Sequence, residues 1–246
     1  MESYSEQNDI HAQSVGGWLV KNEKKIYIFL VIVALLFPLG IFLRTPKWEV
    51  QNGVLTISPR LFHAKMKDYK DFGDAPWYPQ KETIRAIVIK NGVKNIGRLA
   101  FDGCDNVTSV SIPNSVTSIG WSAFCVCESL TSIDIPQNVT NIGGCAFAGC
   151  KELQSISIPN NVTSIGERAF NYCLRLTSLT IPSSVTCIEE GTFCGCRSLA
   201  SLTIPNSVKK ISEYEVFTEC YSLSLRIPKR FRGKLDLSDC KSVTYY

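Results

Sequence analysis

Cysteine is the residue type with the greatest chemical potential in this sequence. Six of the 11 cysteines form a column that recurs every 23 residues and slips by one at its end: Cys104, Cys127, Cys150, Cys173, Cys196 and Cys220. Thiols in such a pattern can form disulfides, bind zinc or pack as small apolar side chains. A Phe lies three residues before each cysteine of the column. We therefore expect these thiols to be reduced and buried in an apolar core.

The other two thiol chemistries suit the spacing less well. Equivalent residues of neighbouring repeats would lie about 4.8 Å apart, which is within the range of Cα–Cα distances across a disulfide. Disulfides between neighbouring repeats are therefore an alternative. An odd total of 11 cysteines, however, is not typical of a disulfide framework. The C-x-C pairs Cys125/Cys127 and Cys194/Cys196 suggest zinc. Three repeats separate the pairs, roughly 14 Å along a stack, whereas zinc–sulfur bonds are about 2.3 Å long. We predict no metal site.

The sequence contains few residues that could perform acid–base or nucleophilic catalysis. The two histidines are His11 and His63, and no nucleophile–base–orienter set can be assembled around them. Asp68, Asp71 and Asp74 could be calcium ligands, but their spacing does not match an EF-hand and its loop glutamate is missing. They fit a solvated acidic loop better. The sequence predicts a protein that is not an enzyme and needs no cofactor.

A 23-residue repeat must position all of these groups. In the copy Ile142–Ser164, IGGCAFAGCKELQSISIPNNVTS, the apolar residues from Ile142 to Cys150 are three to four residues apart, which suits a short helical turn. The segment Leu153–Ile158 alternates like a strand, and Pro159 ends it because it has no N–H for a ladder. One copy cannot bury its apolar face alone, so the sequence predicts an α/β solenoid of stacked copies.

The repeat also resembles a known family. The pattern IGxxAFxxCxxLxxIxIPxxVTx is similar to the BspA-like leucine-rich repeat, also called the Treponema pallidum-type repeat, over residues 84–228. The resemblance implies a leucine-rich repeat fold with one short strand and one helical turn in each 23-residue unit. It also implies a place on a microbial surface and adhesion to host proteins or other cells.

The outward strand positions are the expected interaction surface. Solenoids bind partners through such rows, although small polar residues also simply solvate a sheet face. Residues 96–228 carry eight Lys/Arg against 11 Asp/Glu, which argues against nucleic-acid binding. We expect a protein or glycan ligand. The two rows are Ser109, Ser132, Ser155, Ser178 and Ser201, and Ser111, Asp134, Ser157, Thr180 and Thr203.

The N-terminal part is expected to anchor the repeats. Residues 1–25 form a polar tail, and residues 26–43 are 18 consecutive uncharged residues. At about 1.5 Å per residue they span roughly 27 Å, close to the hydrocarbon thickness of a bilayer. We predict a single transmembrane helix; a cleaved signal peptide and a buried soluble helix are the alternatives. Lysines before the segment favour a cytoplasmic N-terminus and repeats on the outer side. The opposite orientation would make the chain a cytoplasm-facing scaffold.

Caps are expected at both ends of the stack. Residues 48–83 contain Asn52-Gly53 between two alternating runs, which predicts a hairpin within an N-terminal cap. Residues 229–246 form the expected C-terminal cap. Four basic residues there suit a solvated edge, with a polyanion contact as the alternative: Lys229, Arg230, Arg232 and Lys234.

Overall fold

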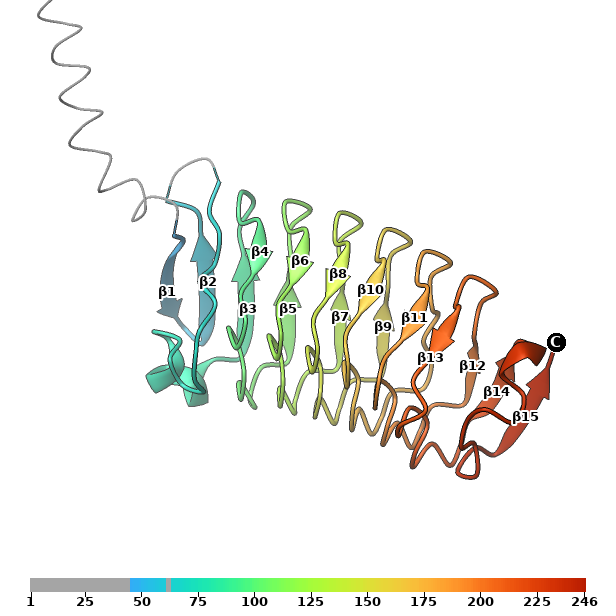
Figure 1. Ribbon diagram of the computed structural model, residues 1–246. Coiled ribbons are helices and arrows are strands. Elements are labelled where there is room, and N and C mark those ends of the chain that lie inside the picture. Colours follow the sequence, from blue (N-terminus) through green and yellow to red (C-terminus); the bar gives the residue numbers. More distant parts are fainter. Residues whose placement is uncertain (1–44, 61–62) are drawn as a thin grey trace, which may run out of the picture. The chain divides into compact units, whose positions relative to one another are not determined.

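The computed structural model describes residues 45–60 and 63–246, which form one stack of repeats with a cap at each end (Figure 1). The predicted polar tail 1–25 and the predicted transmembrane helix 26–43 lie outside the described residues. Within the described ranges, no helix is both long enough and apolar enough to span a bilayer.

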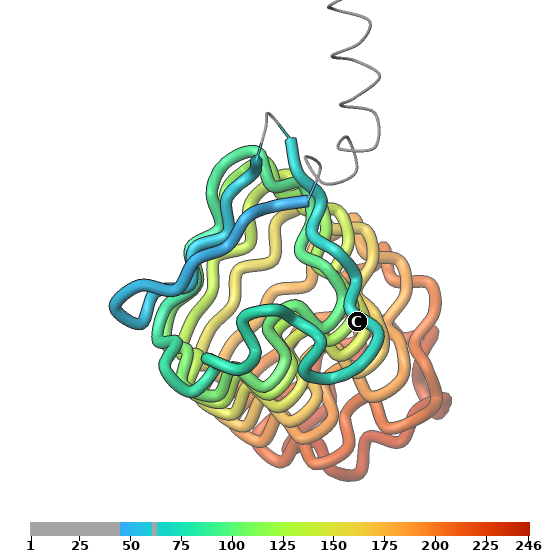
Figure 2. Tube along the Cα trace, turned by 90° about the vertical axis from the view of Figure 1, so that its left-hand side faces the viewer, coloured from blue at the N-terminus to red at the C-terminus, as the bar shows by residue number. Residues whose placement is uncertain are grey.

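The N-terminal cap begins with the expected hairpin. Strand β1 (Lys47–Gln51) pairs antiparallel with β2 (Val54–Ser58). Asn52 and Gly53 join them with φ values of 50° and 77°, the left-handed conformation that a two-residue hairpin turn requires. A 3₁₀ helix, η1 (Tyr78–Thr83), follows in the same cap. Figure 2 views the stack from this end, with the cap in front of the repeats.

One parallel ladder, here called the first ladder, carries the predicted strands. Its members repeat in register, so that Ala86 pairs with Ser109, Ser132 with Ser155, and Ser201 with Ser224. Its C-terminal end is closed by β15, which pairs parallel with β14. The members are β3 (Ala86–Ile89), β5 (Ser109–Ser111), β7 (Ser132–Asp134), β9 (Ser155–Ser157), β12 (Ser201–Thr203), β14 (Ser224–Ile227) and β15 (Ser242–Tyr245).

A second parallel ladder was not expected from the sequence. Each member is a two-residue strand that ends in the isoleucine opening a repeat, and these isoleucines are buried. The members are β4 (Asn95–Ile96), β6 (Ser118–Ile119), β8 (Asn141–Ile142), β10 (Ser164–Ile165), β11 (Cys187–Ile188) and β13 (Lys210–Ile211). Each repeat thus contributes strands to two sheets, except that 165–187 contributes only one bridge residue, Ser178, to the first ladder.

The predicted helical turn is not confirmed. Residues 144–149 and 151–152 form turns, with left-handed backbone at Cys145 (φ 52°) and Gly149 (φ 71°). Their N–H groups bond alternately to the next repeat, as Phe147 does to the Ala169 carbonyl at 2.9 Å, and to the third residue before, as Cys150 does to the Phe147 carbonyl at 3.2 Å. An α-helix would need right-handed residues throughout and bonds to the fourth residue before. Apolar residues that lie three to four positions apart suit both an α-helix and this series of turns. The sequence pattern alone therefore could not distinguish the two structures.

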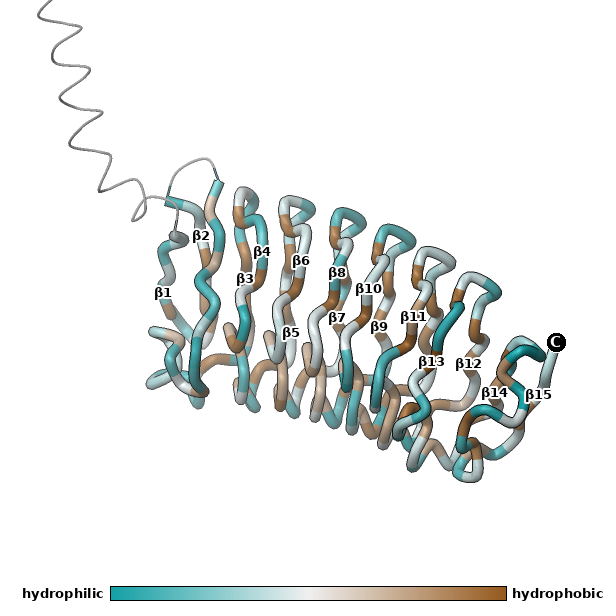
Figure 3. The backbone as a smooth tube through the Cα atoms, in the orientation of Figure 1, coloured by the Kyte–Doolittle hydropathy of each residue, from teal (hydrophilic) through white to brown (hydrophobic). Residues whose placement is uncertain are grey.

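A column of stacked aromatic rings runs through the core. Ring centroids of neighbours lie 5.2–6.0 Å apart, and Trp77 of the cap occupies the first place. The Trp77 indole N–H donates to the Ala100 carbonyl at 2.8 Å, and Trp48 and Tyr69 pack edge-on against it. The N-terminal end of the core is thereby sealed. The column is Trp77, Phe101, Phe124, Phe147, Phe170, Phe193 and Phe217. Figure 3 shows hydrophobic positions recurring from repeat to repeat.

Glycine after the opening isoleucine sets the spacing of the second ladder. A Cβ on Gly143 would lie 2.6 Å from the Gly120 carbonyl carbon, a distance that real Cβ atoms do not reach. Gly97, Gly120 and Gly166 are equally close to the preceding backbone, at 2.0–2.6 Å. The next two repeats carry Glu189 and Ser212 instead. The second ladder accordingly runs unbroken from β4 to β10, stops, and resumes as the separate pair β11–β13.

The first ladder is divided into three sheets, with one break between β5 and β7 and another between β9 and β12. At the second break the chain forms only single bridges, from Ser178 to Ser155 and from Ser178 to Ser201. We call residues 165–187 the junction repeat. It lies between the continuous part of the second ladder, β4 to β10, and the separate pair β11–β13.

Candidate interaction surface

The predicted outward rows are exposed along the first ladder. All ten of the side chains named above are exposed, from Ser109 to Thr203. The residues between them point into the core, as Ile133 (3% exposed) and Leu202 (2%) do. This follows from the two-residue period of a strand, which sends alternate side chains to opposite faces.

A hollow interrupts this surface at the junction repeat. It has a volume of about 310 Å³. Four hydroxyl side chains line it, together with three aliphatic residues at its floor and wall: Ser157, Ser178, Thr180, Ser201, Ile156, Ile158 and Leu179. None of these residues is charged, so the hollow is suited to neutral groups that form hydrogen bonds.

Arg226 continues the row of Thr180 and Thr203. It pairs with Thr203 across β12 and β14, and its side chain is exposed. Its guanidinium lies 5.4 Å from the centre of the Tyr246 ring, a cation–π distance. The Tyr246 hydroxyl donates to the Ile204 carbonyl at 2.5 Å, which fixes the ring. Arg226 is therefore a positioned cation at the end of a row of hydroxyl groups.

The cysteine column is part of the core. All 11 cysteines are free, and the six of the column are buried, as their spacing predicted. Each of five thiols donates to a phenylalanine carbonyl of the preceding repeat, as Cys150 does to Phe124 at 3.1 Å and Cys173 to Phe147 at 3.2 Å. Burial raises the pKa of Cys104 and of Cys220 to about 12. At neutral pH these thiols are protonated, so they are poor nucleophiles and poor metal ligands.

With this geometry in place, comparison with known proteins identifies the repeat. The family model of the BspA type leucine rich repeat region matches six copies over residues 77–181 and 118–234, more than half of the chain. The chain belongs to this family.

Solved structures of bacterial leucine-rich repeat proteins share its fold. The chain is 26% identical to the T. pallidum leucine rich repeat protein with a TM-score of 0.58, over 72% of this chain and 87% of that one. It is 27% identical to a leucine-rich repeat protein from Bacteroides ovatus, also with a TM-score of 0.58, over 74% of this chain and 54% of that one. A search of curated proteins found none that matches.

On the side of the stack that is formed by the turns, here called the turn side, ion pairs join neighbouring repeats of this BspA-type chain. Lys151 lies 2.6 Å from Glu128, Arg175 lies 2.7 Å from Glu152, and Arg168 pairs with Glu190. Such exposed pairs each contribute about 0–1 kcal/mol to stability. Their larger effect is to give these three cations partners within the chain.

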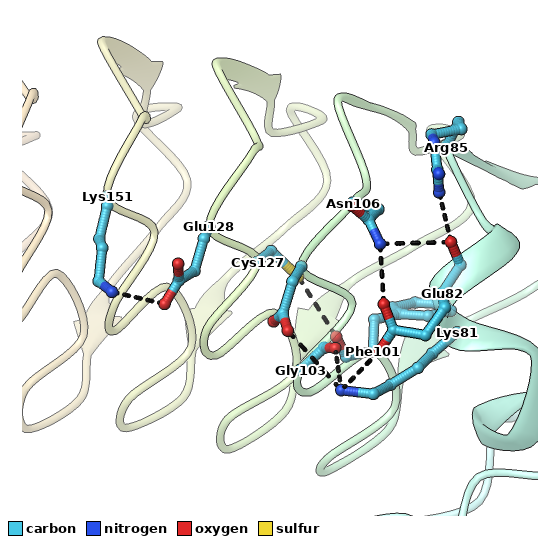
Figure 4. A network of polar contacts seen from close by, with 10 residues as sticks. Lys81, Glu82, Arg85, Phe101, Gly103, Asn106, Cys127, Glu128 and Lys151 are labelled. Atoms are coloured by element: carbon cyan, nitrogen blue, oxygen red, sulfur yellow. Dashed lines mark hydrogen bonds and ion pairs between the residues drawn. The ribbon is translucent and has the colours of Figure 1, made fainter.

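At the N-terminal end Lys81 ties the cap to the first full repeat. Its ammonium donates to the Gly103 carbonyl at 3.0 Å and lies 3.7 Å from the Asp105 carboxylate (Figure 4). Asn106 donates to the Glu82 carboxylate at 2.9 Å in the same network. These residues join elements across the cap boundary and do not form a catalytic arrangement.

Asp102 is an unusual group that sequence reasoning did not single out. The residue is 8% exposed, and its Oδ1 has no hydrogen-bond partner in the described part of the chain. Burial raises the pKa of this carboxyl to about 6, although a hydrogen bond from Cys125 and the charge of Lys81 oppose the shift. The only sequence signal was a charged residue at a position where the next two repeats carry Cys125 and Ala148.

The other candidate residues lie apart from one another. His63 is exposed in the cap beside Lys65 and Lys94, and His11 falls outside the described residues. Asp68 accepts the Arg98 N–H at 2.7 Å, and Asp74 accepts that of Asp71 at 3.1 Å. In residues 45–60 and 63–246, no three His, Cys, Asp or Glu side chains are grouped so as to hold a metal ion.

Proposed function

We propose that this chain is a membrane-anchored module on the outer side of the cell that binds a protein or glycan and performs no chemistry. The observation that carries the proposal is the first ladder, where an apolar core holds ten small polar side chains exposed in two rows. Rigid rows of this kind are the binding surfaces of solenoid proteins.

Three further features support the proposal. The chain is a BspA-type leucine-rich repeat protein, and such repeats are interaction modules. The uncharged segment 26–43 has the length of a membrane span. The column thiols, the residues with the most chemical potential, are protonated and buried in packing roles. The mildly acidic repeat body makes nucleic acid an unsuitable partner.

Protease treatment of intact cells tests the display. Cells that produce the full-length chain with a tag at Tyr246 are treated with protease before and after lysis. We expect the repeats to be digested on intact cells and a short N-terminal fragment to remain protected in the membrane. Repeats that survive until lysis would instead support the cytoplasm-facing scaffold. Full release of the protein by carbonate washing would contradict the membrane anchor.

A further inference from the structure

We propose that the hollow of the first ladder and Arg226 together form a binding site for an acidic oligosaccharide. Sugar hydroxyls would bond to Ser157, Ser178, Thr180 and Ser201, and a carboxylate or sulfate of the same ligand would pair with the Arg226 guanidinium. This inference rests on the proposed function and names the ligand class of the same surface.

The lining of the hollow matches a sugar. Each of its four hydroxyl side chains can donate one hydrogen bond and accept two, as sugar hydroxyls also do. Ile156 and Leu179, which are 6% and 7% exposed, provide a small apolar floor for the C–H face of a sugar ring. Protein-binding sites usually contain large aromatic or arginine side chains that contribute most of the binding energy. The lining of the hollow contains no such side chain.

Arg226 supplies a cation at a fitting distance from the hollow. It pairs with Thr203 of β12, one ladder step of about 4.8 Å away, and Ser201 of the same strand lines the hollow. The body arginines Arg175 and Arg197 bond to glutamates of neighbouring repeats at 2.7 and 2.5 Å. Among the residues that the structure describes, no carboxylate forms an ion pair with Arg226. Its planar guanidinium therefore remains available for a carboxylate or sulfate, which it can bind through two parallel bonds.

The charges on either side of the hollow give the ligand a direction. Asp134 pairs with Ser157 on the N-terminal side of the hollow and disfavours an anion there. On the C-terminal side, Arg226 is followed by the exposed residues Lys229, Arg232 and Lys234, which raise the local concentration of anions. The acidic group of the ligand is therefore placed toward β14 and its neutral part in the hollow.

Binding measurements on the full-length protein in a mild detergent test the site. The probes are oligogalacturonate, heparin oligosaccharides, neutral dextran oligosaccharides and poly-glutamate, all at physiological ionic strength because charge contacts are screened by salt. The first two separate a carboxylated from a sulfated ligand. Dextran tests the need for an acidic group, and poly-glutamate tests an acidic peptide as the occupant.

Two variants address the two halves of the site. Arg226→Gln is expected to weaken binding of the acidic oligosaccharide by about tenfold or more, since it removes a charge-assisted pair. Thr180→Val keeps the shape and removes one hydroxyl, and we expect a loss of about fivefold. Thermal midpoints should not change, because both side chains are exposed.

Two matched controls separate a site from general charge attraction. Arg232 also stacks on a tyrosine of β15, at 5.5 Å from the Tyr245 ring, but it lies outside the outward rows. Arg175 lies on the turn side. Arg232→Gln and Arg175→Gln should each change the affinity by less than about twofold if direct pairing at Arg226 dominates.

Several results would overturn the proposal. Equal losses for Arg226→Gln and Arg232→Gln would indicate diffuse attraction, and a silent Thr180→Val would remove the hollow from the site. Poly-glutamate that binds as tightly as the oligosaccharides would indicate a peptide surface. The absence of binding to both oligogalacturonate and the heparin oligosaccharides would also refute the ligand class. None of these outcomes affects the protease test, which needs no ligand.

Discussion

The four repeats with glycine after the opening isoleucine and the two repeats that follow them bury the same kinds of side chain but form separate sheets in the second ladder. The four repeats that open at Ile96, Ile119, Ile142 and Ile165 place glycine next, and their second ladder is continuous. The two that open at Ile188 and Ile211 carry Glu189 and Ser212 at that position and form a separate two-stranded sheet. The aromatic column continues through both parts at a similar spacing.

This difference shows which contacts determine the spacing between neighbouring repeats. Ring stacking tolerates small changes in spacing, so Phe217 still stacks on Phe193 at 6.0 Å. Where glycine follows the opening isoleucine, the contacting backbones of the second ladder leave no room for a Cβ. Beyond the junction, β11 and β13 pair with Glu189 and Ser212 at that position. The apolar core therefore sets the fold throughout, and the glycine column sets how closely the repeats that carry it approach. The hollow lies where the first ladder is reduced to single bridges.

The largest effect is expected from the aromatic column. Phe147 is fully buried between Phe124 and Phe170, so Phe147→Ala should lower the free energy of unfolding by about 3–5 kcal/mol. Phe217 contacts one ring of the column, and Phe217→Ala should cost less, about 2–3 kcal/mol. Denaturant unfolding of the full-length protein measures both values.

The control for the core variants is Ser155→Ala, an exposed change on β9 of the same repeat as Phe147. It should alter the free energy of unfolding by less than about 0.5 kcal/mol. A loss as large as that of Phe147→Ala would mean that the inward and outward faces are assigned wrongly.

The glycine column should give a large effect on one side of the junction only. Gly143→Ala places a Cβ 2.6 Å from backbone atoms of Gly120 and Trp121, and we expect a loss of about 3 kcal/mol. Glu189→Ala, at the equivalent position beyond the junction, should stay within about 0.5 kcal/mol because its Cβ is already accommodated. Similar losses for the two variants would show that the glycine column does not explain the break in the ladder.

Asp102 offers a smaller effect that depends on pH. Burial raises the pKa of its carboxyl to about 6 from the ordinary 3.8, so the folded protein holds this proton more tightly than the unfolded chain. The carboxyl therefore destabilises the fold progressively as the pH rises from about 4 to about 6, by at most about 3 kcal/mol.

The isosteric variant Asp102→Asn tests this effect. We expect Asp102→Asn to stabilise the protein at pH 7.5 and to have nearly no effect at pH 4, measured by denaturant unfolding at each pH. A variant that destabilises equally at both values would assign Asp102 a hydrogen-bonding role in place of an electrostatic penalty.

Much of the fold could be predicted because burial repeats with the sequence. Ile133, Phe147 and Cys150 are buried as their columns indicated, and Ser155 is exposed. The helical turn was not confirmed, because apolar spacing reports which side chains face the core and not the sign of φ at Cys145 or Gly149. The two-residue strands of the second ladder are too short to leave an alternating pattern.

The sequence by itself determined the repeat, its register, the inward columns and the outward rows. These follow from a strict 23-residue period and the side-chain alternation of a strand, which are local properties. Only the tertiary structure decided the second ladder, the hollow at the junction repeat, the setting of Arg226 against Tyr246 and the burial of Asp102. These depend on how closely the backbone of one repeat approaches the next, and that distance is a property of neighbouring turns of the chain together.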